Sequence, residues 1–197
     1  MDKYSASGDK IYCYPKTNIL KNKLNIKDAD ILSEAERDFS ELAISQIEYA
    51  DPPYDLKYLK SIHSQLFSDI YEWAGELRQV DISKGDTRFC NFSRIEVEAN
   101  KILKKLQQDN YFNNLDHKNF IYKIADLYCE LNVIHPFREG NGRTQRIFFE
   151  HLIVFCGYGI DWAKVPSQDA WIDANIKGYH CDLSGLIQIF TECLILE

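Results

Sequence analysis

Apolar residues recur at helical spacing along most of the chain, which predicts a mainly α-helical protein. Four segments, at about 28–49, 55–75, 93–106 and 116–131, each carry their apolar residues on one face. The predicted inner face of the first segment consists of Ile31, Ala35, Phe39, Leu42, Ala43 and Ile47. Capping and breaking residues set the limits of these helices.

Pro52 and Pro53 interrupt the apolar pattern between the first and second segments. Asp55 stands where an N-cap residue is expected at the start of the second helix. Ser93 and Glu96 have the spacing of a capping box, so we expect the third helix to begin there.

One helix differs from the others in its pattern. From Arg143 to Cys156 apolar residues surround the helix axis almost completely, so we expect this helix in the middle of the domain. Gly157 would end it. Two further helices are expected at about 167–177 and 183–196.

The segment from Leu77 to Phe89 departs from the helical pattern. Its β-branched residues stand on both sides of Lys84-Gly85-Asp86, which predicts a short β-hairpin or extended flap with its turn at Gly85. A plain connecting loop explains this segment, taken alone, equally well. The expected fold class is all-α (mainly), with a buried central helix and a short β-hairpin flap.

The composition is that of an ordinary globular domain, with 45% hydrophobic and 27% charged residues in 197. A net charge of −7 without a Lys/Arg cluster argues against direct binding of nucleic acid, which requires a basic surface. No segment has the ~20 apolar residues of a membrane span, nor a signal-peptide pattern, so we expect a cytoplasmic protein. Six isolated cysteines, without a Cys-x-x-Cys pair, disfavour a zinc site.

The candidate chemistry lies between the fourth and central helices, in the sequence HPFREGNGRTQR at residues 135–146. Pro136 is expected to end the preceding helix near His135. Gly140 and Gly142 allow successive backbone N–H groups to point into one concavity, at the positive end of a buried helix. This arrangement predicts an anion site of a size suited to a polyphosphate.

Charged and titratable side chains complete this site. Arg143 and Arg146, three residues apart, lie on the same side of the first helical turns as two guanidinium clamps. Glu139 would repel a phosphate unless a cation sits between them, and Mg²⁺ fits because carboxylates and phosphates are its usual ligands. His135, with a reference pKa of ~6.5, is the candidate proton acceptor. Three or four of these residues alone would indicate only a helix entry with solvated charges.

Other residues in apolar surroundings are expected to have structural roles. His63 and His151 lie in strongly apolar helical stretches, where a hydrogen-bonded core histidine is the better interpretation. Phe137 is expected to anchor the loop as an apolar plug.

Residues 135–146 resemble the signature of the Fic family, His-x-Phe-x-Asp/Glu-Gly-Asn-Gly-Arg-x-x-Arg, at every fixed position. Residues 62–75 are similar to the helix that precedes the family's flap, and residues 14–26 resemble the N-terminal segment of stand-alone bacterial members. The resemblance implies a single Fic domain at 1–197, with an N-terminal helical extension at about 1–52 and a catalytic core at about 55–190.

The resemblance implies a protein adenylyltransferase, which transfers AMP from ATP to a Tyr, Ser or Thr hydroxyl of a target protein. His135 would deprotonate that hydroxyl for in-line attack on the α-phosphorus. Glu139 would hold Mg²⁺ against the α- and β-phosphates.

The same resemblance implies the binding residues. Those implied for the nucleotide are Gly140, Asn141, Gly142, Arg143, Arg146, Ser83, Lys84, Gly85 and Asn175. The Gly140-Asn141-Gly142 backbone and the Asn141 side chain would cradle the phosphates, with Arg143 and Arg146 on the β and γ groups. Asn175, with Trp171 nearby, resembles the later helix near the adenosine. Val80, Asp81 and Ile82 would form the part of the flap that binds the target by strand addition.

Family members that are regulated within one chain carry an inhibitory helix with the sequence Ser/Thr-x-x-x-Glu-Gly/Asn. The nearest match, from Ser68 to Trp73, fails at its last position. The chain therefore resembles toxins that are inhibited in trans by a small antitoxin. Stand-alone toxins of this kind resemble those that modify type II topoisomerases, which suggests such a target by analogy alone.

Two alternatives stay open. Fic-fold phosphotransferases carry Lys at the second motif glycine, where Gly142 favours AMP transfer; another nucleotidyl donor or a phosphocholine donor also fits the cradle. The alternative of another class is a non-catalytic nucleotide- or protein-binding module. Such a module would be supported by degenerate catalytic residues, and none is degenerate here.

Overall fold

The computed structural model describes residues 9–196, so residues 1–8 and 197 of the expected domain lie outside the described residues. The α-helices of the described part are α1 (Ala29–Ile44), α2 (Leu56–Phe67), α3 (Ile95–Gln108), α4 (His117–Ile134), α5 (Asn141–Phe155), α6 (Gln168–Tyr179) and α7 (Ser184–Cys193). Short 3-10 turns lie at η1 (Phe92–Arg94), η2 (Asn110–Phe112) and η3 (Trp162–Lys164). The mainly α-helical class expected from the sequence is confirmed.

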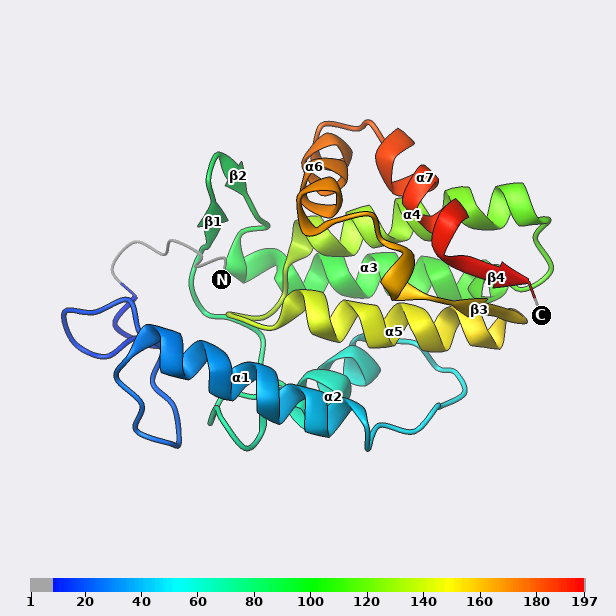
Figure 1. Ribbon diagram of the computed structural model, residues 1–197. Helices are drawn as coiled ribbons and strands as arrows, with labels where there is room; N and C mark the ends of the chain where they lie inside the picture. The colour runs from blue at the N-terminus through cyan, green and yellow to red at the C-terminus, as the bar shows by residue number, and fades with distance from the viewer. Residues whose placement is uncertain (1–8, 197) are drawn as a thin grey trace.

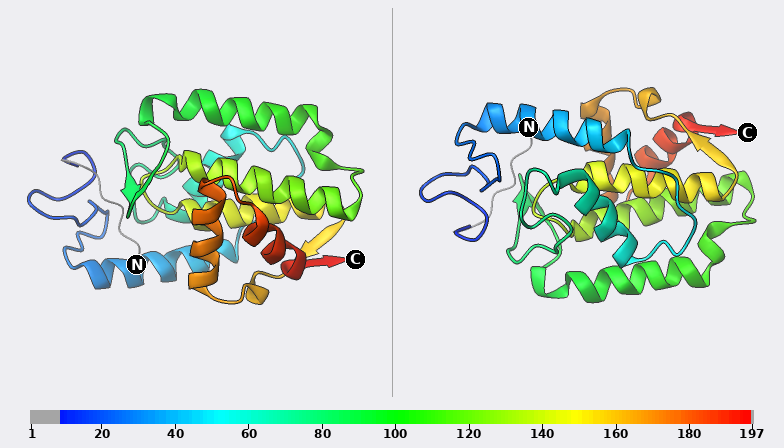
Figure 2. Two further views of the ribbon diagram at one scale, coloured as in Figure 1. Left: turned by 90° about the horizontal axis from the view of Figure 1, so that it is seen from above. Right: turned by 90° about the horizontal axis from the view of Figure 1, so that it is seen from below.

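Helix α5 lies at the centre of the fold. It packs against α2 on one side and against α4 on the other. Figure 2 shows α1 and α3 on opposite sides of it. Phe148, Phe149, Leu152 and Ile153 are completely buried along its length, whereas Val154 is 41% exposed. The prediction of a buried central helix is confirmed.

Helix α1 is shorter and turned differently than predicted. It ends at Ile44, and its buried residues are Leu32, Glu36 and Ser40. Ile31 and Leu42, which were expected on the inner face, are 56% and 60% exposed. Phe39, Ala43 and Ile47 pack against the core as predicted. The prediction was wrong for Ile31 and Leu42, because apolar spacing does not detect a polar stripe that is buried with hydrogen-bonding partners elsewhere in the fold.

Two other helix limits also differ from the predictions. Helix α2 ends at Phe67, and the chain continues through turns in which Ile70 and Tyr71 remain buried. Ser93 and Glu96 form no capping box, because Asn91 caps η1 by accepting a hydrogen bond from the Ser93 N–H at 3.1 Å. Helix α3 begins two residues later, at Ile95.

The predicted hairpin is present. Strands β1 (Ser83–Lys84) and β2 (Thr87–Arg88) pair antiparallel, with Lys84 opposite Thr87. Gly85 has a φ of +54° in the two-residue turn, a conformation that favours glycine. The flap stands at one end of the helical body (Figure 1).

A second small sheet was not predicted. The chain after α7 leaves the helical conformation at Leu194 and forms β4 (Leu194–Leu196). This strand pairs antiparallel with β3 (Tyr158–Ile160), which directly follows α5. The predicted helix over 183–196 therefore ends early, because its last residues find backbone partners more than thirty positions away.

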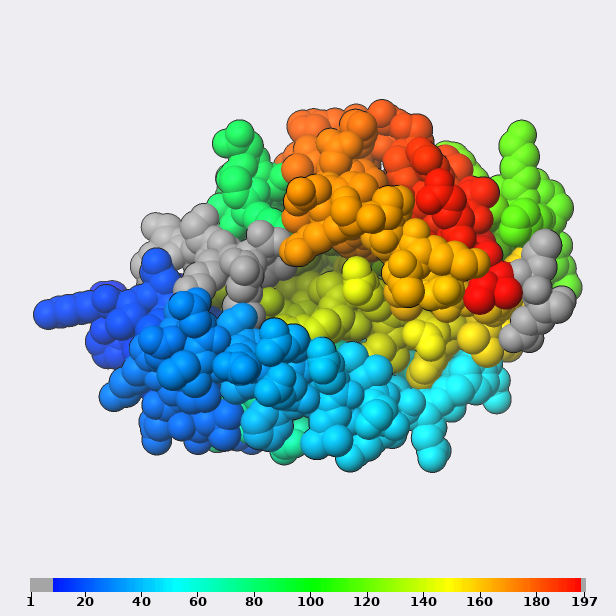
Figure 3. Space-filling view, viewed as in Figure 1, coloured from blue at the N-terminus to red at the C-terminus, as the bar shows by residue number. Residues whose placement is uncertain are grey.

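Within residues 9–196 no helix is long and apolar enough to cross a membrane. The molecular surface is hollowed between α1 and α6, and atoms of α5 lie at the floor of this hollow (Figure 3).

Candidate active site

A cavity with a volume of about 570 Å³ opens beside the N-terminal end of α5. Its wall is built by the flap, the end of α4, the start of α5 and one side of α6. Of the residues expected to act on ATP or the target, it is lined by Lys84, His135, Gly142, Arg146 and Asn175. The volume is typical of small-molecule binding sites.

His135 directly follows α4 in a left-handed conformation, with φ of +48°. Its Nδ1 lies 2.9 Å from the backbone oxygen of Asn132. Because that oxygen can only accept, the hydrogen is on Nδ1, and Nε2 is the ring nitrogen with the lone pair. The ring of Phe89 stacks on the imidazole at 4.0 Å between centroids.

Burial lowers the pKa of His135 to about 3, and the positive charges of Arg78 and Lys84 act in the same direction. The imidazole is therefore neutral at pH 7. A neutral ring with its lone pair on Nε2 is the form that can accept a proton from a hydroxyl.

The loop between His135 and α5 is closed by Asn141. Its Oδ1 accepts a hydrogen bond from the Phe137 N–H at 2.8 Å, and its Nδ2 donates to the Phe137 oxygen at 2.8 Å. The side chain is buried and engaged within the loop. Gly140 has a φ of +79°, and a Cβ at this position would overlap the ring of Phe67.

Arg143 faces α1 and is not among the residues that line the cavity. Its Nη1 donates to Ser40 Oγ at 2.9 Å and to the Glu36 backbone oxygen at 3.0 Å, and its Nη2 lies 3.3 Å from Glu36 Oε2. The guanidinium lies over the ring of Phe67 at 4.6 Å. Glu36 also accepts a hydrogen bond from the hydroxyl of Tyr71.

Arg146 lines the cavity on the other side of α5. Its guanidinium carbon lies 5.7 Å from the ring centroids of both Trp162 and Trp171. It forms no ion pair within residues 9–196. The two tryptophan rings therefore stabilise its charge through cation–π contacts. Its hydrogen-bond donors are available to an anionic ligand.

Glu139 is partly buried in the loop before α5 and is not among the residues that line the cavity. Its Oε1 accepts a hydrogen bond from the Gly140 N–H at 2.9 Å. Burial raises the pKa of Glu139 to about 7, and the neighbouring negative charge of Glu36 adds to the effect.

A divalent cation beside Glu139 would favour its ionised form. No group of three His, Cys, Asp or Glu residues forms a metal site within residues 9–196. A single carboxylate nevertheless suits Mg²⁺, which takes its other ligands from phosphates and water.

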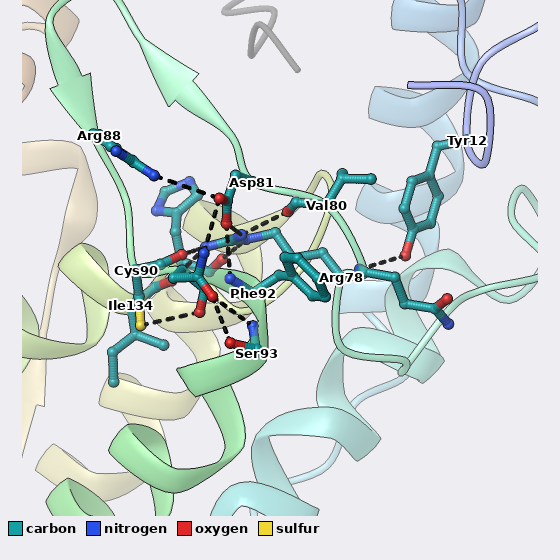
Figure 4. Close-up of polar contacts among 12 residues, drawn as sticks. Tyr12, Arg78, Val80, Asp81, Arg88, Cys90, Phe92, Ser93 and Ile134 are labelled. Carbon is teal, nitrogen blue, oxygen red and sulfur yellow. Dashed lines mark hydrogen bonds and ion pairs between the residues drawn. The ribbon is translucent and has the colours of Figure 1, made fainter. Parts of the chain in front are cut away.

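The first leg of the flap is anchored to the body by the three residues expected to bind a target. Ile82 is 2% exposed. The Asp81 carboxylate accepts hydrogen bonds from the Phe92 N–H at 2.8 Å and from Asn91 Nδ2 at 2.9 Å (Figure 4). The backbone oxygen of Val80 accepts from Arg78 Nη1 at 2.7 Å.

The outer edge of β2 is also engaged. The hydroxyl of Tyr179 donates to the Arg88 oxygen at 3.2 Å, and the Cys90 N–H donates to the Val133 oxygen at 3.0 Å. A strand from another protein could add to this edge only by displacing these contacts. Ser83, Lys84 and Gly85 form the tip of the hairpin, and of these Lys84 lines the cavity.

Asn175, on α6, lies beside Trp171 in the cavity wall. Its Nδ2 donates to the Trp171 backbone oxygen at 2.8 Å, whereas its buried Oδ1 has no hydrogen-bond partner within the described residues. The sequence interpretation missed Asn132, Tyr128, Gln168 and Tyr179 as lining residues. Their spacing on α4 and α6 is that of ordinary helix positions, so no motif marks them.

The structural interpretation of His63 and His151 is confirmed. His63 accepts a hydrogen bond from the Gly75 N–H at 2.7 Å, and its Nε2 lies 3.0 Å from the Glu139 oxygen. Burial lowers the pKa of His63 to about 4. His151 is 6% exposed and is hydrogen-bonded to Tyr58. His63 therefore supports the signature loop from behind.

Comparison with known proteins places these features in context. The model of the Fic/DOC family matches residues 53–153. A Salmonella typhimurium protein named "Probable protein adenylyltransferase Fic" is 42% identical over 193 residues, covering 98% of this chain and 96% of the relative. An Escherichia coli protein of the same name is 41% identical, covering 97% and 94%. The crystal structure of the BepC protein from Bartonella tribocorum with bound AMPPNP has a TM-score of 0.85 at 28% identity, covering 94% of this chain and 97% of that one.

Proposed function

The chain belongs to the Fic/DOC family, and from this premise we propose that it transfers the AMP part of ATP to a hydroxyl side chain of another protein. Relatives that match nearly the whole chain are named protein adenylyltransferases, so the chain is an enzyme of the nucleotidyltransferase class. The observation that carries the proposal is the neutral imidazole of His135 in the same cavity as Gly142 and Arg146.

In the proposed reaction the cavity binds ATP with its phosphates at the N-terminal end of α5. Backbone N–H groups at the start of this helix favour negative charge. Arg146 binds the terminal phosphates. The hydroxyl oxygen of the target attacks the α-phosphorus, its proton passes to Nε2 of His135, and pyrophosphate leaves with the electrons of the broken P–O bond.

Mg²⁺ bound by Glu139 and phosphate oxygens would offset the negative charge that develops on the leaving group. Arg143 and the Asn141 side chain were expected to contact the phosphates directly. Because both are engaged within the protein, we propose that they act by holding the loop and α1 in place.

For the base, the amide side chain of Asn175 in the cavity wall supports adenine. An amide oxygen can accept a hydrogen bond from the exocyclic amino group of adenine, whereas guanine presents a carbonyl oxygen at the corresponding position. Trp171 lines the same cavity and supplies an aromatic surface beside the base.

The regulatory and cellular parts of the assignment are proposals as well. Arg146 forms no ion pair within residues 9–196, so a glutamate supplied by a separate antitoxin can reach it. A type II topoisomerase as target, a cytoplasmic location and the division into a 1–52 extension and a 55–190 core stay predictions.

The proposal is tested by incubating the purified chain and host lysate with ATP and Mg²⁺, and searching by mass spectrometry for AMP added to a hydroxyl residue. Label on the α-phosphate should enter the target, whereas label on the γ-phosphate should not. The reverse result would identify a phosphotransferase. Binding of ATP without any transfer would favour the non-catalytic module.

The variant His135→Ala, compared with the unmodified chain, tests the role of the imidazole in transfer. We expect transfer to fall by ~10²–10⁴ because the general base is lost. The dissociation constant for ATP should change little, since the imidazole acts on the target hydroxyl. Full transfer activity in this variant would disprove the role of His135.

A further inference from the structure

Arg78 is a buried charged residue between the flap and the catalytic loop, and it is 2% exposed. Its Nε donates to the His135 backbone oxygen at 2.8 Å, and its Nη1 donates to the Val80 oxygen at 2.7 Å. Its Nη2 donates to the oxygens of Cys90 at 2.5 Å and Ile134 at 3.2 Å. Figure 4 shows this guanidinium at the point where the two legs of the flap meet the end of α4.

The four acceptors fall into two pairs. Val80 and Cys90 stand on either side of the β1–β2 hairpin, one on each leg of the flap. Ile134 and His135 are the last residue of α4 and the residue that follows it, at the negative end of the helix dipole. One rigid group therefore joins both legs of the flap to the backbone of the residue that accepts the proton.

Packing alone does not explain an arginine here. Its nearest carboxylate oxygen, Asp81 Oδ1, is 4.0 Å away, so main-chain carbonyls rather than an ion pair compensate for most of the lost hydration. An apolar side chain of similar volume would fill the space without the cost of burying a charge. The planar fork of arginine, with five N–H donors, is the only side chain that can reach four carbonyls in fixed geometry.

We propose that Arg78 is a positioning residue for AMP transfer, which holds the flap and His135 as one unit so that a target bound to the flap presents its hydroxyl to the imidazole. The inference rests on the proposed roles of the flap and His135. Two backbone contacts reinforce the same junction: Arg78 N–H to the Pro136 oxygen at 2.9 Å, and Cys90 N–H to the Val133 oxygen at 3.0 Å.

Arg78→Lys tests the proposal, because lysine keeps the charge but has three donors on one nitrogen. As substrate we use the lysate protein to which the unmodified chain adds AMP. We expect kcat/KM for this protein to fall about 100-fold, since a displacement of about 1 Å between reacting groups has an effect of that size. The dissociation constant for ATP should stay within about threefold, because α5 and α6 carry most of the nucleotide contacts.

The matched control is Arg94→Lys, at an exposed arginine in η1 whose ion pair is with Glu98. It should leave both quantities within about twofold of the unmodified chain. A kcat/KM of Arg78→Lys within twofold of the unmodified chain would overturn the proposal. So would an equal loss of ATP affinity and transfer, which would indicate a general folding defect.

Hydrogen exchange on the unmodified protein provides a measurement that needs no variant. If the guanidinium joins the two elements, the amides of Cys90 and His135 should have protection factors within about threefold of each other. Exchange at Cys90 more than tenfold faster than at His135 would mean that the flap opens independently and would contradict the proposal. Hydrogen exchange can be measured even if the chain shows no AMP transfer. A failure of the proposed function can therefore be distinguished from a failure of the proposed role of Arg78.

Discussion

Arg143 and Arg146 lie three residues apart at the start of α5, and their surroundings differ. Arg143 faces α1, where Glu36, Ser40 and the ring of Phe67 engage its guanidinium. Arg146 faces the cavity between two tryptophan rings and has no carboxylate partner within residues 9–196. The sequence motif treats the two as a pair, whereas the fold uses one to hold the domain together and leaves the other available for a ligand.

The two histidines beside the signature loop differ in the same way as the two arginines. His63 contacts the loop from the side of α2, with both ring nitrogens hydrogen-bonded to backbone groups. His135 lines the cavity with a tautomer that leaves the lone pair on Nε2. One side of the loop thus supports its geometry, and the other side faces the cavity.

Glu36→Ala is expected to have the largest effect on stability. It removes the buried carboxylate that pairs with Arg143 and accepts from Tyr71. Breaking one partner of a buried pair lowers the free energy of unfolding by ~3–5 kcal/mol. Urea unfolding measures this change.

The control is Glu34→Ala on the exposed side of α1, where the Glu34 carboxylate lies 4.0 Å from the Arg37 guanidinium. It should change the free energy of unfolding by less than ~0.5 kcal/mol. Equal effects of the two substitutions would show that Arg143 does not depend on Glu36.

Arg146→Ala should instead change the affinity for ATP more than the stability of the fold. We expect the free energy of unfolding to change by less than ~1 kcal/mol, because only aromatic contacts are lost. The affinity for ATP should fall by ~10–100-fold, since hydrogen bonds to charged groups contribute ~1.5–3 kcal/mol. Calorimetric titration with ATP and with AMP separates the terminal phosphates from the rest of the nucleotide. A loss that is the same for AMP and ATP would contradict the role of Arg146 on the terminal phosphates.

The smallest effect is expected in the pH dependence of stability. Burial holds the pKa of His135 at about 3 in the folded chain, against ~6.5 in the unfolded chain. Between these values the unfolded chain binds the extra proton, so the free energy of unfolding falls as the pH falls from 6.5 toward 3. One such group contributes a slope of ~1.4 kcal/mol per pH unit.

In His135→Ala this contribution is absent, so its stability should depend less steeply on pH by that amount. His63 has the same sign, and Glu139, whose pKa is raised, has the opposite sign. Both contribute equally in the two proteins and cancel in the comparison. Urea unfolding between pH 4.5 and 6 measures the difference, and parallel slopes would mean that His135 is accessible to protons in the folded state.

Much of the fold could be predicted from local sequence patterns. Helical periodicity identified α2 to α6, the turn at Gly85 identified the hairpin, and the unbroken apolar circumference of α5 identified the central helix. The composition of residues 135–146 identified the signature loop of the family. These features depend on residues close to one another in the chain, where spacing and conformational preference determine structure.

Features that depend on distant partners could not be predicted in this way. The polar inner face of α1 exists because Arg143 lies more than a hundred residues later in the chain. Strand β4 forms because β3 offers a backbone edge, although its own sequence continues a helical pattern. The role of Arg78 could not be read from the chain either, since its acceptors are backbone oxygens that only the folded flap and α4 bring together.

The sequence by itself determined the family and the composition of the signature loop, and it predicted His135 as the proton acceptor, because these inferences depend on residue types at fixed spacing. The tertiary structure decided which arginine meets the cavity, which nitrogen of His135 carries the hydrogen and how the flap is attached. Those outcomes depend on hydrogen-bond partners from separate helices, and a buried polar group takes whichever partner the packed fold places beside it.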